Sequence, residues 1–373
     1  MGHSTVSSSV VKSAEYINAT SQHVSINPSG VKHAVKTLQE ARKSGTPFNF
    51  DDWHSHPLNP SLDADPEYIL SWIMVVDALN FSFWSDLEVG LDASSHDAVD
   101  YLCDNKYGVY YREALYQGYW ALPALVNRAL DAGVPLLDFS RASVMSDSEL
   151  TAIFFSGHSS VESYPPLVEL RVKVIKETAL TMVDKFGGSM KNLISQAKNS
   201  ATTFVEIVTS NFPSFNDTSK FMGKDVVLHK RAQILVADIW ACFKGQSFGL
   251  FNDIDQVTMF ADYRVPQALV YLGVLEYSQE LLSKLKSSDP HLASGDPMEV
   301  EIRGNSIWAV ELICQQLKAP PSDNPSAADQ SLTAYSSAQW NAILIDFYLW
   351  EFAKFNSDAL SHIPIHRTRS CFY

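Results

Sequence analysis

The sequence predicts a mainly helical fold with few short strands, arranged as one compact unit. Apolar residues recur at helical spacing along most of the chain, Pro and Gly stand where helices begin and end, and strand-like alternation is scarce. The chain has 373 residues and is 46% hydrophobic, which is enough to bury a large core. Length alone allows one large domain or two to three. Because only the stretch 319–334 resembles a linker, we predict one unit.

The N-terminal portion is predicted to be an arm followed by a helix. Residues 1–27 are rich in Ser and are expected to be flexible, so the structured domain is expected to cover 28–373. After Pro28, apolar residues at helical spacing form one stripe, and Gly45 ends it. This stripe predicts the first helix.

The rest of the chain is predicted to be a series of helices. The clearest covers 165–188, with two Pro at its start and two Gly at its end, because Pro pre-sets φ in a first turn and Gly accepts a left-handed cap. Further helices are predicted over 113–133, 201–211, 228–243, 264–287, 299–318 and 337–356. Short strands are predicted at 226–229 and near 78–84. The Pro-, Ser- and Asp-rich stretch 319–334 is predicted to be a mobile loop.

Charge and cysteine content narrow the classes of function. The 28 Lys and Arg against 42 Asp and Glu give a formal net charge of −14. A protein that grips nucleic acid along its backbone needs a basic surface, whereas one small anionic ligand needs only a few local cations. The four Cys residues are scattered, and neither a signal peptide nor an apolar run long enough to span a bilayer is present. We therefore expect a soluble protein of a reducing compartment, the cytoplasm or alternatively the nucleus.

Common catalytic motifs are absent. The search finds no nucleophile elbow, no phosphate-binding loop and no zinc-deaminase pattern. His54 and His56 share an H-x-H spacing without a second ligand pair, so a structural or solvent-exposed position is favoured for them. No metal or other cofactor is predicted.

A first candidate group lies in the apolar run 72–84. Asp77 and Asn80 stand there among apolar and aromatic neighbours that include Phe81 and Trp84. A buried carboxylate is costly unless it is paired or hydrogen-bonded. Asp77 is therefore either a helix cap or a carboxylate that faces a ligand, and both interpretations stay open.

A second candidate group joins two predicted helices. Lys230 and Asp238 fall near one face of the helix over 228–243, and Asp262 and Arg264 stand at the start of the next helix. An Asp before a helix is typically an N-cap. The clustering of two carboxylates with two cations instead favours a ligand site.

A third candidate group lies near the C-terminus. Glu301 stands near the start of the helix over 299–318, and the chain ends in a basic segment with Arg367, Arg369 and Tyr373. Such a tail is usually solvated. Its hydrophobic ending suggests docking, and its two Arg suit a phosphate clamp.

Together these segments resemble the queuosine salvage family, the queuosine 5′-phosphate N-glycosylases or hydrolases. The resemblance covers nearly the whole chain from about Trp72 and includes the following segments: DALNFSFW, GYWALPALVNRAL, HKRAQILVADIW, MFADYRVPQALVYLG, EVEIRGNSIWAVELI, DFYLWEFA and HRTRSCFY. It implies a helical fold similar to helix–hairpin–helix DNA glycosylases. It also implies hydrolysis of the N-glycosidic bond of queuosine 5′-monophosphate, which releases queuine for return to tRNA.

The resemblance implies a role for each candidate residue. Asp262 matches the position of the catalytic Asp after the hairpin, and Lys230 would hold it ionised or contact the ribose, with a Lys nucleophile as the less favoured variant. The expected contacts to the base are Asp77, Asn80 and Asp238 by hydrogen bonds and Phe81, Trp84 and Tyr263 by stacking. The expected contacts to the phosphate are Arg264, Arg367, Arg369 and Tyr373, and Glu301 is counted with the substrate-binding residues.

Two other functions compete with this hypothesis. One is a non-catalytic queuosine- or nucleotide-binding protein in tRNA modification. The other is a glycosylase acting on nucleic acid, which the net charge of −14 disfavours. We therefore expect a small nucleotide as the partner, with neither nucleic acid nor membrane bound directly.

Overall fold

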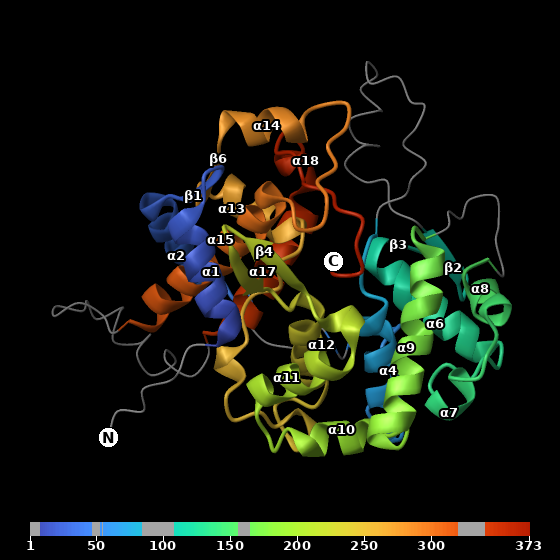
Figure 1. The fold of residues 1–373 in the computed structure, drawn as a ribbon. Helices are drawn as coiled ribbons and strands as arrows, with labels where there is room; N and C mark the ends of the chain where they lie inside the picture. The colour runs from blue at the N-terminus through green and yellow to red at the C-terminus, as the bar shows by residue number, and fades with distance from the viewer. Residues whose placement is uncertain (1–7, 47–52, 54, 84–107, 156–164, 320–339) are drawn as a thin grey trace. The chain divides into compact units, whose positions relative to one another are not determined.

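The computed structural model describes residues 8–46, 53, 55–83, 108–155, 165–319 and 340–373 (Figure 1). Over these residues the chain is mainly helical, with three two-stranded antiparallel sheets. The prediction of a mainly helical fold with few short strands is confirmed. The predicted likeness to DNA glycosylases stays a prediction.

Contacts divide the chain into two compact units. Unit 1 comprises Met1–Phe50, Thr218–Lys230 and Asp253–Thr368. Unit 2 comprises Asp51–Asp217, Arg231–Asn252 and Arg369–Tyr373.

Unit 1 is built around the long helix α15 and is completed by two small sheets. Its helices are α1 (Ser9–Thr20), α2 (Pro28–Lys43), α13 (Arg264–Tyr271), α14 (Gln279–Leu285), α15 (Pro297–Lys318), α17 (Ala342–Phe355) and α18 (Ser357–Leu360), with a 3-10 turn η4 (Ile254–Gln256). Its strands are β1 (Val24–Ile26), β4 (Thr218–Phe221), β5 (Lys224–Val227) and β6 (Leu275–Tyr277). β1 pairs with β6 so that Val24 faces Tyr277, and β4 pairs with β5 so that Thr218 faces Val227.

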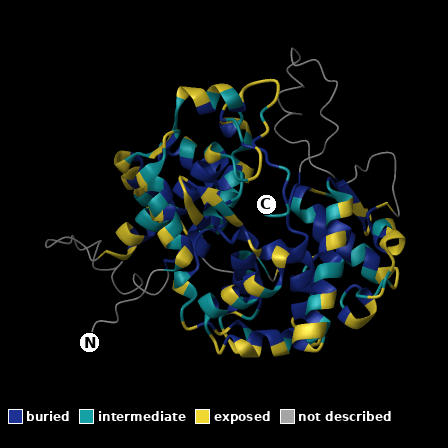
Figure 2. Ribbon diagram, viewed as in Figure 1, coloured by how far each residue is buried: buried dark blue, intermediate teal, exposed yellow. Residues whose placement is uncertain are grey.

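Helix α15 packs against α1, α2, α13 and α17. Its contact with α1 depends on Gly304, since a Cβ there would lie 2.5 Å from Cδ1 of Ile17. Figure 2 shows buried residues on the inner faces of these helices and exposed residues on their outer faces.

The N-terminal arm differs from the prediction. Residues Ser9–Thr20 form helix α1, and Val10, Ala14 and Ile17 are buried on one stripe of it. The Ser8 side chain caps this helix by accepting the N–H of Val11 at 3.3 Å. Apolar residues at helical spacing, paired with an N-cap, explain why this segment is ordered despite its Ser content. The expectation of a flexible arm is therefore not met from Ser8 onward.

The predicted helix over 264–287 is also interrupted. Helix α13 ends near Gly273, which takes a left-handed φ of +72°, and Leu275–Tyr277 then forms strand β6 before α14 begins. A glycine that accepts positive φ just past a helix is a typical stop. Pairing of β6 with β1 explains why the chain is extended there.

Unit 2 is a group of helices with one β-hairpin. Its helices are α4 (Pro66–Ala78), α6 (Ala121–Asp131), α7 (Phe139–Ala142), α8 (Asp147–Phe155), α9 (Val168–Phe186), α10 (Met190–Gln196), α11 (Ala201–Asn211) and α12 (Lys230–Cys242), the first residue of α12 being counted with unit 1. Its 3-10 turns are η1 (Gly118–Trp120), η2 (Pro213–Phe215) and η3 (Ser247–Gly249). β2 (Gly108–Tyr111) pairs with β3 (Ala114–Gln117), and Gly108 faces Gln117.

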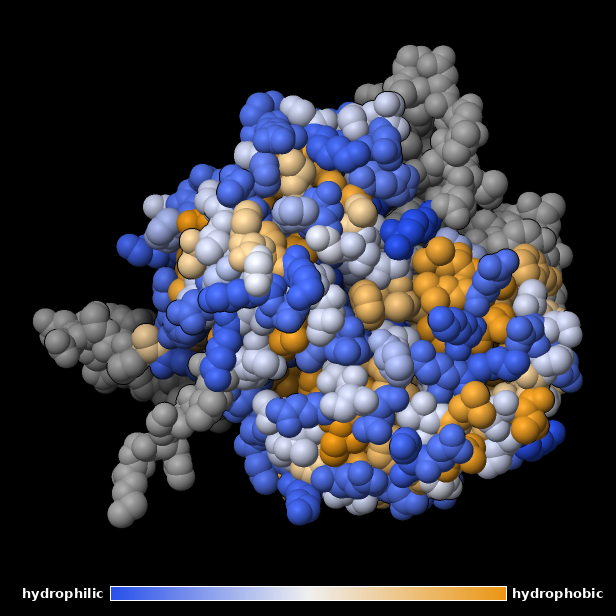
Figure 3. Space-filling model, viewed as in Figure 1, coloured by the Kyte–Doolittle hydropathy of each residue, from blue (hydrophilic) through white to orange (hydrophobic). Residues whose placement is uncertain are grey.

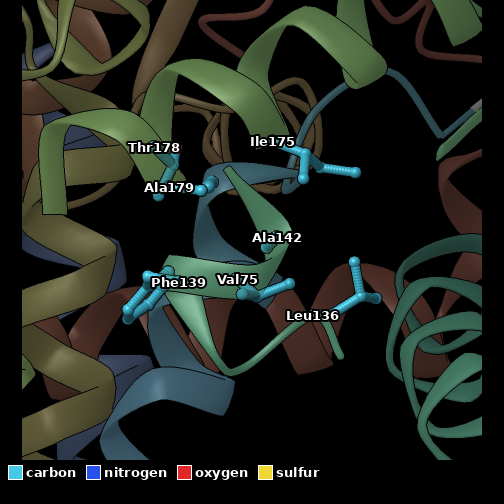
Figure 4. A pocket seen from close by; sticks show the side chains of 8 residues that line it. Val75, Leu136, Phe139, Ala142, Ile175, Thr178 and Ala179 are labelled. Carbon is cyan, nitrogen blue, oxygen red and sulfur yellow. The ribbon is translucent and has the colours of Figure 1, made fainter. Parts of the chain in front are cut away.

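Helix α4 is the buried helix of unit 2. All ten residues from Ile69 to Ala78 are buried, and α4 contacts α6, α9 and α10. A small apolar cavity lies beside it (Figure 4), lined by Val75, Ala78, Leu136, Phe139, Ala142, Ile175, Thr178 and Ala179. On the face shown in Figure 3, hydrophobic side chains gather on unit 2 around β3.

Two further predictions need correction in unit 2. Another prediction falls on residues that the structure does not describe. Residues 114–117 are strand rather than helix, because they pair with β2. The segment after Ala78 is irregular rather than strand, whereas the strand predicted at 226–229 is found as Lys224–Val227. The predicted loop 319–334 falls almost entirely outside the described residues. No helix in the described part of the chain combines the length and apolar character needed to cross a membrane.

Candidate active site

In unit 1, Asp262 caps helix α13. Its Oδ1 accepts the backbone N–H groups of Arg264 at 2.9 Å and of Val265 at 2.8 Å. The capping interpretation is therefore confirmed, and it uses one carboxylate oxygen. Because capping fixes the orientation of the carboxylate, it does not compete with a catalytic role for the second oxygen.

A second carboxyl, Asp346, belongs to the same cluster. It lies buried on α17, and its Oδ2 accepts the N–H of Phe260 at 2.9 Å. Burial, followed by the negative charge of Asp262, raises the pKa of Asp346 well above the usual carboxyl range, and Lys230 opposes that rise. The sequence prediction missed Asp346, although a lone carboxylate in the apolar run NAILIDFYLW is the same signal that singled out Asp77.

Lys230 supplies the positive charge of this cluster. It is buried, and it is the first residue of α12. Burial raises the pKa of Asp262, whereas Lys230, the two helix N–H groups and Arg264 lower it. The structure thus brings together Lys230 and Asp262, as the sequence predicted, and adds Asp346. The preceding residue, His229, has a left-handed φ of +49°, a conformation that costs a non-glycine residue roughly 1–3 kcal/mol and recurs at functional sites.

A buried ion pair on α15 holds the loop in front of Asp262. The Nε of Arg303 donates to the carbonyl of Ala261 at 3.1 Å, and its Nη1 donates to Oε1 of Glu299 at 3.0 Å. Both side chains are at most 1% exposed. Because Asp346 holds the N–H of Phe260 and Arg303 holds the C=O of Ala261, the backbone that leads to Asp262 is fixed from two sides.

Arg264 and Tyr263 lie at the start of α13 and are partly exposed. The guanidinium carbon of Arg264 lies 5.7 Å from the centre of the Tyr263 ring. Its Nη1 donates to Oε1 of Gln267 at 3.4 Å. These residues therefore present a cation and a ring next to Asp262.

Unit 2 contains a separate cluster of acidic and aromatic residues. Asp77 is fully buried in the last turn of α4, and Asp238 lies on α12. Burial raises the pKa of Asp238 to about 7. Burial, Asp238 and Asp77, in that order, raise the pKa of Tyr119 well above its usual value. The two acidic residues predicted from the sequence are thus electrostatic neighbours of one tyrosine that was not predicted.

Aromatic rings extend this cluster. The Tyr119 ring lies 6.0 Å from Phe83 and 5.0 Å from Trp120, both edge to face. Trp120 stacks on His56 with ring centres 3.3 Å apart. Tyr119 and Trp120 lie in the segment GYWALPAL that carries the resemblance, which was the available signal for them. Among the residues that the structure describes, no group of three or more His, Cys, Asp or Glu side chains is arranged to hold a metal ion.

Comparison with known proteins assigns the chain to a family. Residues 58–373 match the queuosine salvage protein family. The chain belongs to the queuosine salvage family. Proteins named queuosine 5′-phosphate N-glycosylase/hydrolase are similar to it along most of their length. The relative from Mus musculus is 39% identical, with 97% of this chain and 98% of the relative covered. The relative from Schizosaccharomyces pombe is 38% identical (93% and 92% covered), and that from Sphaerobacter thermophilus is 34% identical (82% and 82% covered).

Phe81, which the sequence predicted to stack on the base, lies next to two arginines. It is fully buried, and its ring centre lies 4.3 Å from the guanidinium carbon of Arg171 and 5.3 Å from that of Arg231. Arg171 donates to the carbonyls of Leu79 and Phe81, and Arg231 donates to those of Asp77 and Ala78. Carbonyls at a helix end need such donors. The geometry therefore gives Phe81 a structural position between two arginines rather than a surface for stacking.

Asn80 and Trp84 are the other base contacts predicted near Phe81. Asn80 is buried, and its backbone N–H donates to the carbonyl of Asp77 at 3.3 Å. Trp84 lies outside the described residues.

Glu301 has a structural position in this family member. Its carboxylate accepts the backbone N–H groups of Gln22 at 3.0 Å, His23 at 2.6 Å and Val24 at 3.0 Å. The side chain is fully buried. These contacts tie the start of β1 to α15 and leave the predicted substrate-binding role without support.

The predicted phosphate clamp falls in both units. Arg367 is buried in unit 1, and its carbonyl accepts the N–H of Leu292 at 2.9 Å. Arg369 and Tyr373 belong to unit 2, where the carbonyl of Tyr373 accepts the N–H of Ser82 at 3.2 Å. Tyr373 is 1% exposed. The solvated-tail interpretation is therefore wrong, and the docking interpretation is confirmed, since the last residues pack into the protein.

Proposed function

We propose that this chain hydrolyses the N-glycosidic bond of queuosine 5′-monophosphate and releases queuine, which can then return to tRNA. The relatives named queuosine 5′-phosphate N-glycosylase/hydrolase, at 34–39% identity over most of the chain, support this substrate. The observation that carries the chemistry is the cluster in which Lys230 acts on the helix-capping carboxylate of Asp262.

Cleavage of a ribosyl–base bond needs a carboxylate beside the sugar. Positive charge develops at the anomeric carbon and negative charge on the leaving base, and a carboxylate can stabilise the cation, attack it or activate water. We assign this role to Asp262. Burial raises the pKa of Asp262, and Lys230, the two helix N–H groups and Arg264 limit that rise and so favour the anion. Lys230 is also the residue we assign to the ribose.

Recognition of the base is assigned to the predicted acidic and amide side chains. The amino and ring N–H groups of a 7-deazaguanine are donors, and Asp77 and Asp238 offer acceptors next to Tyr119. Asn80 is assigned to the same edge of the base, and Trp84 and Tyr263 stay candidates for stacking. For the 5′-phosphate the assigned residues are Arg264, Arg367, Arg369 and Tyr373.

We further propose a free nucleotide as the partner and the cytoplasm as the compartment. The net charge of −14 supports a small substrate over a nucleic-acid duplex. Four scattered Cys residues support a reducing compartment. The scheme assigns no step to a metal or other cofactor.

The decisive experiment compares Asp262→Asn with the parent protein on queuosine 5′-monophosphate, with release of queuine followed by chromatography. Asn caps a helix about as well as Asp, so the fold and ligand binding are expected to persist, whereas kcat is expected to fall by at least about 10²-fold. Asp262→Ala is the matched control for capping and is expected to lose a further ~1 kcal/mol of stability.

Two results would count against the proposal. Release of queuine at the parent rate by Asp262→Asn would remove Asp262 from the chemistry. Binding of the nucleotide by the parent protein without any release of queuine would instead favour a protein that only captures queuosine nucleotides.

A further inference from the structure

The cluster in unit 1 contains a second carboxyl for which the proposed reaction has no role. Asp346 is 4% exposed, and its Oδ2 accepts the N–H of Phe260 at 2.9 Å. The carbonyl of the same Phe260 accepts the N–H of Asp262 at 2.6 Å. Phe260 therefore links the two residues, since its N–H binds Asp346 and its carbonyl binds the backbone of Asp262.

The surroundings of the two carboxyls differ in how well they stabilise an anion. Asp262 is partly exposed and has two helix N–H groups, Lys230 and Arg264 in its favour. Asp346 is buried and has one backbone N–H and Lys230. Asp262 contributes to the raised pKa of Asp346, because two neighbouring carboxyls do not both ionise readily. Burial and the smaller set of stabilising groups favour the neutral form at Asp346.

The elements packed against α17 carry the following charged groups. Helix α13 contributes Arg264, which favours the anion at Asp262. Helix α15 contributes Arg303, which is paired with Glu299. Helix α18 contributes the exposed Asp358.

We propose that Asp346 is a positioning residue that stays neutral in the working enzyme. It carries the proton of the Asp262–Asp346 pair, and through Phe260 it fixes the loop in front of Asp262. This inference rests on the proposed function for its kinetic consequences. The neutral carboxyl leaves Asp262 as the anion of the pair, balanced by Lys230. With Oδ2 occupied by the N–H of Phe260, the proton lies on Oδ1.

Asp346→Asn is the sharp test because an amide reproduces the shape of a neutral carboxyl and can still accept the N–H of Phe260. We expect kcat to stay within about threefold of the parent value. We also expect the acid limb of kcat/KM, which reports the ionised base of the free enzyme, to keep its midpoint. Asp346→Ala removes the acceptor for Phe260 and is expected to lower kcat by about tenfold or more. An ionised Asp346 would instead shift the acid limb in the Asn variant, and a residue without a positioning role would leave kcat unchanged in the Ala variant.

A second measurement does not depend on activity. In the unfolded chain the carboxyl of Asp346 ionises near its ordinary pKa of 3.8, whereas in the folded protein it keeps its proton. Because the unfolded state then binds fewer protons, the folding constant of the parent should fall about tenfold per pH unit relative to Asp346→Asn above about pH 4. Asp358→Asn, at an exposed site on the neighbouring helix, is the matched control for the loss of one aspartate. Asp346→Ser, a second neutral variant, should reproduce the slope if the Asn variant folds poorly.

Three results would overturn the proposal. If the ratio of the folding constants of the parent and Asp346→Asn did not change with pH, Asp346 would be ionised in the folded protein. A shift of the acid limb to lower pH in Asp346→Asn would mean the same, because it would show that a competing negative charge had been removed. A loss of kcat beyond about 100-fold in a folded Asp346→Asn would make the proton of Asp346 a reactant. If the parent protein released no queuine, the folding-constant ratio would still decide the charge of Asp346, so failure of the proposed function is distinguishable.

Discussion

Replacement of Arg303 by Met is expected to damage stability and activity together. The guanidinium is 1% exposed and donates to Oε1 of Glu299 at 3.0 Å and to the carbonyl of Ala261 at 3.1 Å. Met fills a similar volume but donates to neither acceptor. The fully buried carboxylate of Glu299, which also accepts the N–H of Gly295 at 2.9 Å, then loses its ion-pair partner.

Removal of one partner from a buried ion pair costs about 3–5 kcal/mol, and an unsatisfied buried carbonyl costs about 1–3 kcal/mol when counted alone. We therefore expect Arg303→Met to lower the free energy of unfolding by about 3–5 kcal/mol. Urea unfolding followed by circular dichroism measures this loss. Because Ala261 precedes Asp262, kcat should fall as well.

The double variant Glu299→Gln with Arg303→Met is the matched control. It removes the uncompensated buried charge, so it should recover part of the stability that the single variant loses, and the double-mutant cycle should give a coupling energy of at least about 1 kcal/mol. If Arg303→Met were within about 1 kcal/mol of the parent protein, the buried pair would not hold the loop and the reasoning would be refuted.

Two further predictions concern two ionisable residues of unit 1, His366 and Lys230. Burial, followed by Arg303, lowers the pKa of His366 from 6.5 to about 3. The stability due to the neutral imidazole is therefore present above pH 6.5 and is lost at about 1.4 kcal/mol per unit as the pH falls toward 3. His366→Gln should flatten this dependence in urea midpoints compared at about pH 7 and pH 4, and an unchanged dependence would contradict the assignment. Lys230→Ala should lower kcat by more than about tenfold on queuosine 5′-monophosphate, whereas an unchanged kcat would reduce Lys230 to a structural ion pair.

Local sequence signals predicted the part of the site that local structure builds. Asp262 could be identified because Pro266 marks a helix start and Asp before a helix caps it. The contact between Phe260 and Asp346 spans 86 residues, so no local pattern could reveal it. Asp346 was visible only as a lone carboxylate in an apolar run.

The aromatic residues of unit 2 show a different limit. Phe81 and Phe83 are two residues apart in one apolar run, and sequence composition gives no reason to prefer one of them. The choice is made by Arg171, whose contact with the Phe81 carbonyl spans 90 residues, and by Tyr119, which contacts Phe83. Long-range donors at the end of α4 therefore decide which ring is enclosed and which ring joins the acidic cluster.

In each of the two clusters, a buried arginine donates to a main-chain carbonyl at or next to an acidic residue. In unit 1 Arg303 bonds the carbonyl of Ala261, the residue before Asp262. In unit 2 Arg231 bonds the carbonyls of Asp77 and Ala78. A guanidinium presents several donors in a fixed fork, so a bond to the main chain beside an acidic residue fixes the backbone from which the carboxylate projects. The sequence suggested cations only for ligand binding. Other cations, the buried arginines, instead fix the backbone at the acidic residues to which we assign base recognition and catalysis.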